Sequence, residues 1–257
     1  MLRMTVNIIF RSGTKPVQTS QIPSSKIEYG RYNRRIMRVR KFLHSCLLVE
    51  KGDGKILFDP GTFSFVDDDP KPAGLTGITA IIITHSHPDH MDAEAIKTIV
   101  DQNAGCVIYS NSGIAKGLGE KGLRVQLFES GTRQVGEFKI DAYEARHEKI
   151  VSGQIPPNTA YVVDENLLNP GDSYAFSLDA LRGKFKVLAL PTMAPWTNEL
   201  ETLGFASRMD AKRIIPIHDG YVKDFFLRMR YDNWQNVFGS QSVKFERLER
   251  AGDEIDL

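Results

Sequence analysis

A continuous apolar run stands out in the first half of the chain. Residues 78–84 read Ile-Thr-Ala-Ile-Ile-Ile-Thr, and a short run of this kind is typical of a β-strand that is buried on both faces. Upstream, residues 38–50 and 55–59 are rich in apolar side chains and flank the pair Asp53-Gly54. An Asp-Gly pair between two apolar segments predicts a β-hairpin.

Strands and helices alternate along the rest of the chain. Short apolar segments predict strands at residues 106–109, 123–128, 137–145, 159–164, 185–190 and 213–217. Apolar residues at helical spacing predict helices at residues 92–101, 112–121, 175–181, 198–208 and 222–238. The last of these helices would turn inward Phe225, Phe226, Met229, Trp234 and Val237. Two regions of buried strands mixed with helices predict an α/β fold in which helices cover two sheets.

The remaining segments complete this outline. Residues 1–10 read as a first strand, residues 63–77 as a loop and residues 243–257 as a strand-like tail. Asp92 precedes the first predicted helix and is a favourable N-cap residue. No linker interrupts the pattern, so we expect one domain over residues 1–257.

Composition narrows the class of protein. The chain has 257 residues, of which 41% are hydrophobic and 25% charged, as is usual for a globular protein. Its formal net charge of +1 gives no reason to expect a membrane or nucleic-acid partner. The only cysteines, Cys46 and Cys106, lie in apolar segments and predict buried thiols without a disulfide framework. A cytoplasmic location is the default expectation.

The strongest chemical signal follows the apolar run at residues 78–84. Three of the six histidines fall in the stretch His85-Ser86-His87-Pro88-Asp89-His90. Imidazole and carboxylate groups bind zinc, and they bind manganese and iron as well. Four side chains so close in sequence cannot easily converge on one ion, but they can serve two ions roughly 3.5–4 Å apart. The plainer alternative, surface histidines beside a capping aspartate, does not explain this density.

Three further ligand candidates each follow a predicted strand region. His147 comes after residues 137–145, Asp172 after the strand region that starts at residue 159, and His218 after residues 213–217. Taken alone, each of them would be read as a structural residue. Because all three follow apolar strands, they can gather at one edge of a pair of sheets.

These motifs, in this order, resemble those of the metallo-β-lactamase superfamily over residues 43–220. The matching motifs are the 85–90 stretch, His147, Gly171-Asp172-Ser173 and Pro216-Ile217-His218. The resemblance implies a four-layer αβ/βα sandwich with two mixed sheets, helices on the outer faces and two metal ions at one edge. It implies that one ion is bound by His85, His87 and His147, and the other by Asp89, His90 and His218. Asp172 would bridge the two ions, and Asp59 would orient a ligand histidine.

Finer features resemble the branch that contains L-ascorbate-6-phosphate lactonase. They are His44-Ser45-Cys46-Leu47, Gly171-Asp172-Ser173 and Pro191-Thr192-Met193. The chain departs from that branch at Ser173, where threonine is commoner, and at residues 192–196, which replace a glycine pair. No exosite arm of the tRNA-processing members is evident. The departures concern the substrate pocket and leave the ligand set complete.

The ligand set implies hydrolysis by a water activated between two metal ions, zinc first, with manganese or iron as alternatives. Asp89 and Asp172 are the catalytic candidates. We expect a small-molecule ester substrate, of the lactone or phosphorylated sugar-acid type. The alternatives are a phosphodiesterase or nuclease, and a non-catalytic metal-binding or regulatory protein. β-Lactam hydrolysis is not expected. The helix at residues 222–238 could dock a second copy, although packing on its own sheet is the simpler use.

Four residues are candidates for substrate contacts. Arg146 and Lys149 flank His147, and Trp196 lies in a proline-containing loop that could wall a pocket. His44 is the histidine left over, either a substrate contact or a structural imidazole. The basic residues within 31–41 are expected to be a solvated face, with an anion site as the alternative.

Overall fold

The computed structural model describes residues 36–66, 70–151 and 153–257. The strand predicted at residues 1–10 lies outside these ranges, as do Arg31, Arg34 and Arg35 of the basic stretch. In the described part of the chain, no helix has both the length and the apolar character needed to cross a membrane.

Two seven-stranded mixed sheets form the centre of the molecule. The first sheet has the order β14-β1-β2-β3-β4-β5-β6, with bounds Glu254–Asp256, Arg38–Lys41, Leu47–Lys51, Gly54–Phe58, Ala80–Ile82, Val107–Ser110 and Val125–Leu127. The second has the order β13-β12-β11-β10-β9-β8-β7, with bounds Lys244–Phe245, Arg213–Ile217, Val187–Pro191, Leu167–Asn169, Thr159–Val163, Phe138–Glu144 and Gly131–Val135. Parallel pairing runs from β3 to β6 and from β10 to β13, and the other pairs are antiparallel.

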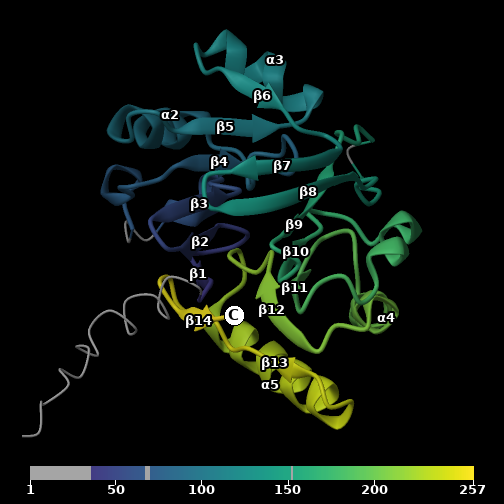
Figure 1. Cartoon of the computed structure of the whole chain (residues 1–257). Helices are drawn as coiled ribbons and strands as arrows, with labels where there is room; N and C mark the ends of the chain where they lie inside the picture. The colour runs from purple at the N-terminus through teal and green to yellow at the C-terminus, as the bar shows by residue number, and fades with distance from the viewer. Residues whose placement is uncertain (1–35, 67–69, 152) are drawn as a thin grey trace, which may run out of the picture.

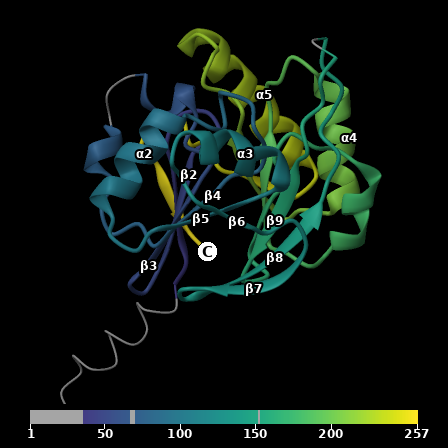
Figure 2. The ribbon, with the colours of Figure 1, turned by 90° about the horizontal axis from the view of Figure 1, so that it is seen from above.

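Helices cover the outer face of each sheet (Figures 1 and 2). Helices α2 (Ala93–Gln102) and α3 (Ser112–Glu120) lie on the first sheet, and α4 (Glu199–Met209) and α5 (Asp224–Ser240) lie on the second. Among the described residues, the short 3-10 helices Thr62–Phe65, Pro72–Gly74 and Phe176–Leu181 lie in the connections. The predicted four-layer αβ/βα sandwich, with its two mixed sheets, is therefore confirmed.

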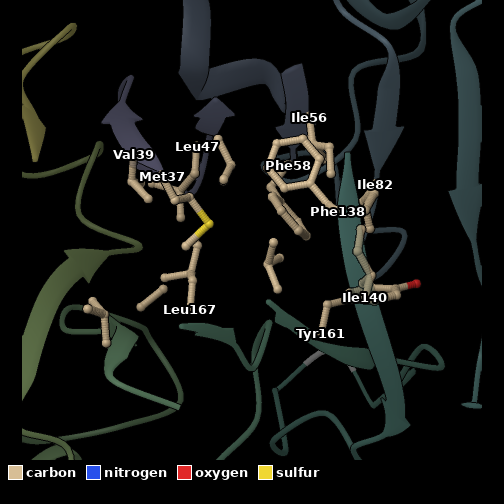
Figure 3. Packing of buried hydrophobic residues seen from close by; sticks show 14 of the residues in the cluster. Met37, Val39, Leu47, Ile56, Phe58, Ile82, Phe138, Ile140, Tyr161 and Leu167 are labelled. Atoms are coloured by element: carbon tan, nitrogen blue, oxygen red, sulfur yellow. The ribbon is translucent and has the colours of Figure 1, made fainter. Parts of the chain in front are cut away.

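The layers explain why the strands read as continuous apolar runs. Leu47 and Ile56 face the core between the two sheets, whereas their neighbours Leu48 and Leu57 face the helices outside the first sheet. Figure 3 shows the core between the sheets, where Phe58 of β3 lies near Phe138 and Tyr161 of the second sheet. Because both faces of these strands are covered, alternation between apolar and polar residues disappears.

Most predicted elements are present, with some corrections. The hairpin joins β2 to β3, but its left-handed residue is Gly52, with a φ of 60°, while Gly54 already belongs to the strand. Strands β7 and β10 were not predicted as separate strands. The prediction of the inward face of α5 was partly wrong, because the Phe225 and Met229 side chains are 67% and 48% exposed. The buried residues of α5 are Tyr231, Trp234 and Phe238.

In the described part of the basic stretch, Arg38 and Arg40 are partly exposed and Lys41 is buried. Arg38 pairs with Asp256 and Glu254, and Arg40 pairs with Glu254. Lys41 is 3% exposed and its Nζ lies 2.5 Å from Asp219 Oδ2. These cations are neutralised by carboxylates of the protein itself, which leaves them poorly suited to bind an external anion. Cys46 is buried, Cys106 is partly buried, and both are free thiols.

Candidate metal centre

The predicted ligands converge from four connections. His85, His87, Asp89 and His90 lie between β4 and α2, and Asp92 caps α2 by accepting hydrogen bonds from the backbone N–H groups of Glu94 and Ala95. His147 follows β8, Asp172 follows β10 and His218 follows β12. Thus one sheet supplies the histidine-rich loop and the other supplies the three remaining ligands.

The first group consists of His85, His87, His147 and Asp172, whose ligand atoms all lie within 4.8 Å of one another. His87 Nδ1 lies 3.1 Å from both His85 Nε2 and His147 Nε2, and His147 Nε2 lies 3.6 Å from Asp172 Oδ2. Tetrahedral zinc with bonds of 2.0–2.1 Å would hold its ligand atoms roughly 3.3 Å apart. The spacing of this group therefore suits one ion of that size.

The second group consists of His44, Asp89, His90 and His218. His218 Nε2 lies 3.5 Å from Asp89 Oδ2 and 3.0 Å from Asp172 Oδ2, and His90 Nε2 lies 3.3 Å from Asp172 Oδ1. Asp172 therefore touches both groups, as a bridging carboxylate must. His90 Nε2 and Asp172 Oδ1 are buried without a hydrogen-bond partner. Such orphaned groups require an explanation, and a cation between them provides one.

Outer hydrogen bonds aim the ligand histidines. His147 Nδ1 bonds the carbonyl of Glu148 at 2.6 Å, and His218 Nδ1 bonds the carbonyl of Met193 at 3.2 Å. His85 Nδ1 bonds Thr84 Oγ1 at 3.0 Å. The two carbonyl oxygens can only accept, and Thr84 Oγ1 gives its own proton to Asp59. Each bond therefore places the ring proton on Nδ1 and leaves Nε2 to face the centre.

Asp59 orients His90, the fourth ligand histidine with an outer bond at Nδ1. Its Oδ1 accepts a hydrogen bond from Thr84 N at 2.7 Å, and its Oδ2 accepts from Thr84 Oγ1 at 2.9 Å and bonds His90 Nδ1 at 3.0 Å. Asp59 is fully buried and has a φ of 46°. It joins the end of β3 to the histidine-rich loop, so that His90 Nε2 points at Asp172.

Gly61 lets the histidine-rich loop lie directly against the chain that follows β3. A Cβ atom at this position would lie 1.9 Å from the Asp89 carbonyl oxygen and 2.4 Å from His90 N. Backbone atoms cannot move aside as a flexible side chain can. The glycine of the Asp59-Pro60-Gly61 turn therefore sets how closely the two segments approach.

Asn158 is a functional residue that the sequence did not reveal. Its side-chain Nδ2 donates to the carbonyls of Ala145 and Pro170, and its Oδ1 accepts from Asp172 N. It thereby ties the segment before His147 to the turn that carries Asp172. A single asparagine beside a strand carries no recognisable signal, so only the packed structure shows this role.

The charges of the centre favour a cation. Although burial alone would raise it, the nearby His218 and His90 hold the pKa of Asp172 well below its usual value. In the same way, against the effect of burial, the hydrogen bond from His44 and the charges of His90 and His218 lower the pKa of Asp89. Both carboxylates are therefore ionised at neutral pH. Against the effect of burial, Asp172 raises the pKa of His90 and of His218, so a bound cation would displace the Nε2 protons of these imidazoles.

The expected substrate contacts lie in different places. Trp196 donates its Nε1–H to Asp172 Oδ2 at 2.9 Å, and its ring centroid lies 6.4 Å from that of His147. Trp196 and Arg146 both line a cavity of about 650 Å³, whereas the exposed Lys149 is not among its lining residues. His44 is fully buried with both ring nitrogens hydrogen-bonded, so it does not line this cavity as a substrate contact would.

This fold and this pair of ligand groups define a metallo-β-lactamase-like protein. Residues 38–218 match the family model described as the Beta-lactamase superfamily domain, and the chain belongs to that family. The solved structures it resembles include Igni18, a metallo hydrolase from Ignicoccus hospitalis, with a TM-score of 0.63 and 18% identity over 86% of this chain and 98% of that one. The metallo-beta-lactamase fold protein YhfI from Bacillus subtilis has a TM-score of 0.63 and 18% identity, over 86% and 100% of the two chains. At 18% identity, the structural similarity to these two proteins shows a shared fold and nothing about the reaction.

Two curated relatives are closer in sequence. Protein Rv0786c from Mycobacterium tuberculosis is 33% identical over 193 residues, which cover 72% of this chain and 85% of that protein. The UPF0173 metal-dependent hydrolase YtkL from Bacillus subtilis is 30% identical over 202 residues, which cover 71% and 85%. The aligned part of each relative is therefore most of its length.

Proposed function

We propose that the protein is a metal-dependent hydrolase that binds two divalent cations and cleaves a small ester, of the lactone or phosphorylated sugar-acid type. The observation that carries this proposal is the pair of complete ligand groups that share Asp172. The description of YtkL as a metal-dependent hydrolase supports the reaction class. Zinc suits the mixture of imidazole and carboxylate ligands, and manganese or iron would also fit.

Each side chain of the centre has a distinct task. His85, His87 and His147 would hold one ion, Asp89, His90 and His218 the other, and Asp172 would contact both. When bound, two such ions supply an activated water at neutral pH and polarise the substrate oxygen. The outer bonds of Asp59 and Trp196 keep His90 and Asp172 aimed at the centre. The histidines of the centre are already used as metal ligands or in hydrogen bonds, so none is left to activate a side-chain nucleophile. We therefore assign no such nucleophile.

The cavity of about 650 Å³ is the proposed substrate pocket, and its size suits a small molecule. It shares two walls with the metal centre: the indole of Trp196 and the residues on either side of His147. Trp196, Tyr174 and Phe176 give it aromatic surface. Aromatic walls suit the carbon skeleton of a substrate. Polar groups of the substrate would then be bound by the charged residues of the lining.

Three of the four charged residues in this lining are already engaged by the protein. Arg208 bonds Asp179 and the Tyr174 carbonyl, Glu148 accepts from Tyr174 N, and Glu201 accepts from Asn198 N. Within the described ranges the side chain of Arg146 has no hydrogen bond or ion pair, and it is exposed. An uncommitted guanidinium beside a metal ligand suits a carboxylate or phosphate of the substrate.

Initial rates on two substrate classes test the proposed reaction. The protein, loaded separately with zinc and with manganese, is assayed on a small lactone and on bis(p-nitrophenyl) phosphate. We expect metal-dependent opening of the lactone that falls by about 100-fold or more in Asp172→Asn, because the shared ligand loses its charge. Asp101→Asn makes the same change on the exposed face of α2 and should leave the rate unchanged.

The other outcomes separate the alternatives. Cleavage of the phosphodiester alone, with the same dependence on metal and Asp172, would move the reaction to a phosphodiesterase. Lactone opening that survives unchanged in Asp172→Asn would contradict catalysis by this centre. Two bound metals without turnover of either compound would favour a binding or regulatory protein.

A further inference from the structure

His44 lies at the second ligand group, yet its surroundings differ from those of a ligand. It is fully buried in the turn between β1 and β2, with a φ of 62°. Its ring meets Phe63 edge-on at a centroid distance of 5.3 Å and lies 5.4 Å from the ring of Tyr221. These ring contacts hold the plane of the imidazole, independently of its hydrogen bonds.

The position of the ring proton follows from two hydrogen bonds. The backbone N–H of Gly220 donates to His44 Nδ1 at 3.1 Å. Because a backbone N–H can only donate, Nδ1 must accept and carries no proton. The proton of the ring is then on Nε2, which lies 3.1 Å from Asp89 Oδ2 and donates to it. This is the opposite tautomer from that of His90, His147 and His218, whose Nδ1 atoms face outer partners.

The backbone holds His44 in this place. The His44 carbonyl accepts a hydrogen bond from His218 N at 3.2 Å. A Cβ atom at Gly220 would lie 2.9 Å from both His44 Cβ and His44 N, so the two turns are in close contact. His44 is thus tied to two ligand-bearing segments, through its side chain to Asp89 and through its main chain to His218.

We propose that His44 is a positioning residue that holds Asp89 for the second metal ion and is itself neither a metal ligand nor a substrate contact. To bind an ion, its Nε2 would have to give up both its proton and the bond to Asp89. A carboxylate oxygen has two lone pairs, so Asp89 Oδ2 can accept from His44 and still face the ion beside His218 Nε2, which lies 3.5 Å away. Outer bonds of this kind typically contribute about 10–100-fold to metal affinity.

The variants His44→Gln and His44→Asn form a matched pair that tests this role. Both introduce the same amide group, but only the glutamine amide reaches as far as Nε2 and can donate to Asp89. Asparagine is the better residue at a left-handed φ, so a purely structural role favours His44→Asn. The affinities of both zinc sites are measured by competition with a chelating dye, alongside thermal unfolding of the metal-free proteins.

We expect His44→Asn to weaken the weaker zinc site by about 10–100-fold while the tighter site is unchanged, and His44→Gln to stay within about threefold of the wild type. Metal-free stability should follow the opposite order, with His44→Asn the more stable. Equal zinc affinity in both variants and the wild type would overturn the proposal. An equal loss of one zinc ion in both variants would instead make His44 a ligand.

A measurement on the unsubstituted protein covers the case in which a variant does not fold. In the zinc-loaded protein, ¹⁵N NMR of the imidazole groups should show His44 as a neutral ring with its proton on Nε2. A His44 signal with the proton on Nδ1 and a metal-bound Nε2 would contradict the proposal directly.

Discussion

Three residues of the metal centre stand in the left-handed backbone region although none is glycine. His44, Asp59 and His218 have φ values of 62°, 46° and 63°. Such conformations cost about 1–3 kcal/mol each and persist only where the surroundings enforce them. Asp59 and His218 directly follow β3 and β12, and His44 lies in the turn between β1 and β2. The His218 side chain faces Asp172, and those of Asp59 and His44 bond the ligand residues His90 and Asp89. In the described part of the chain, three of the seven non-glycine residues with positive φ therefore lie at this centre.

At the residue scale, the sequence shows which groups can bind metal but not what holds them. The histidine-rich stretch is visible because four donors occur within six positions. In contrast, the partners His44 and Asp89 are 45 positions apart, and Trp196 and Asp172 are 24 apart. These contacts arise only from how the turns meet, which no local pattern encodes.

Arg146 allows a residue-scale prediction about substrate. Arg146→Met should raise KM for an anionic ester, mono-p-nitrophenyl succinate, by about tenfold or more, since a charge-assisted hydrogen bond of roughly 1.5–3 kcal/mol is lost. KM for the neutral p-nitrophenyl acetate should stay the same. Lys149→Met removes the same charge outside the cavity and serves as the control. Equal changes in the two variants, or on the two esters, would argue against an anion site at Arg146.

At the element scale, the central strands are predicted from the sequence because burial on both faces makes them continuous apolar runs. Polar or very short strands give no such run and were not predicted. Strand β7 reads Gly-Thr-Arg-Gln-Val and is exposed along four of its five residues, so it has no apolar signature. Strand β10 has three residues. Helix α5 carries apolar residues on more than one face, and the packing of Tyr231, Trp234 and Phe238 on the second sheet selects which are buried.

Two Phe→Ala substitutions on α5 test this assignment. Phe238 is 1% exposed, and Phe238→Ala should lower the free energy of unfolding by about 3–5 kcal/mol because it leaves a cavity. Phe225 is 67% exposed, and Phe225→Ala should change it by less than about 0.5 kcal/mol. Urea unfolding monitored by circular dichroism measures both. Similar losses of unfolding free energy in the two variants would mean that the Phe225 side chain is also buried against the protein.

At the scale of the whole molecule, each ligand group draws on both halves of the sandwich. In the first group His85 and His87 follow a strand of the first sheet, whereas His147 and Asp172 follow strands of the second. The second group likewise joins Asp89 and His90 to His218. The centre therefore exists only when the sheets pack through the core shown in Figure 3. Short continuous apolar runs mixed with helical segments predicted the two sheets, but how the sheets lie against each other depends on that packing.

The most direct test of the proposed binuclear centre is a titration of metal-free protein with zinc, in which bound zinc per chain and the rate of lactone hydrolysis are measured on the same samples. We predict binding of two zinc ions per chain and a rate that develops as the second ion binds, because both ligand groups share Asp172. Full activity with one ion per chain, or activity that persists without metal, would contradict a two-metal hydrolase.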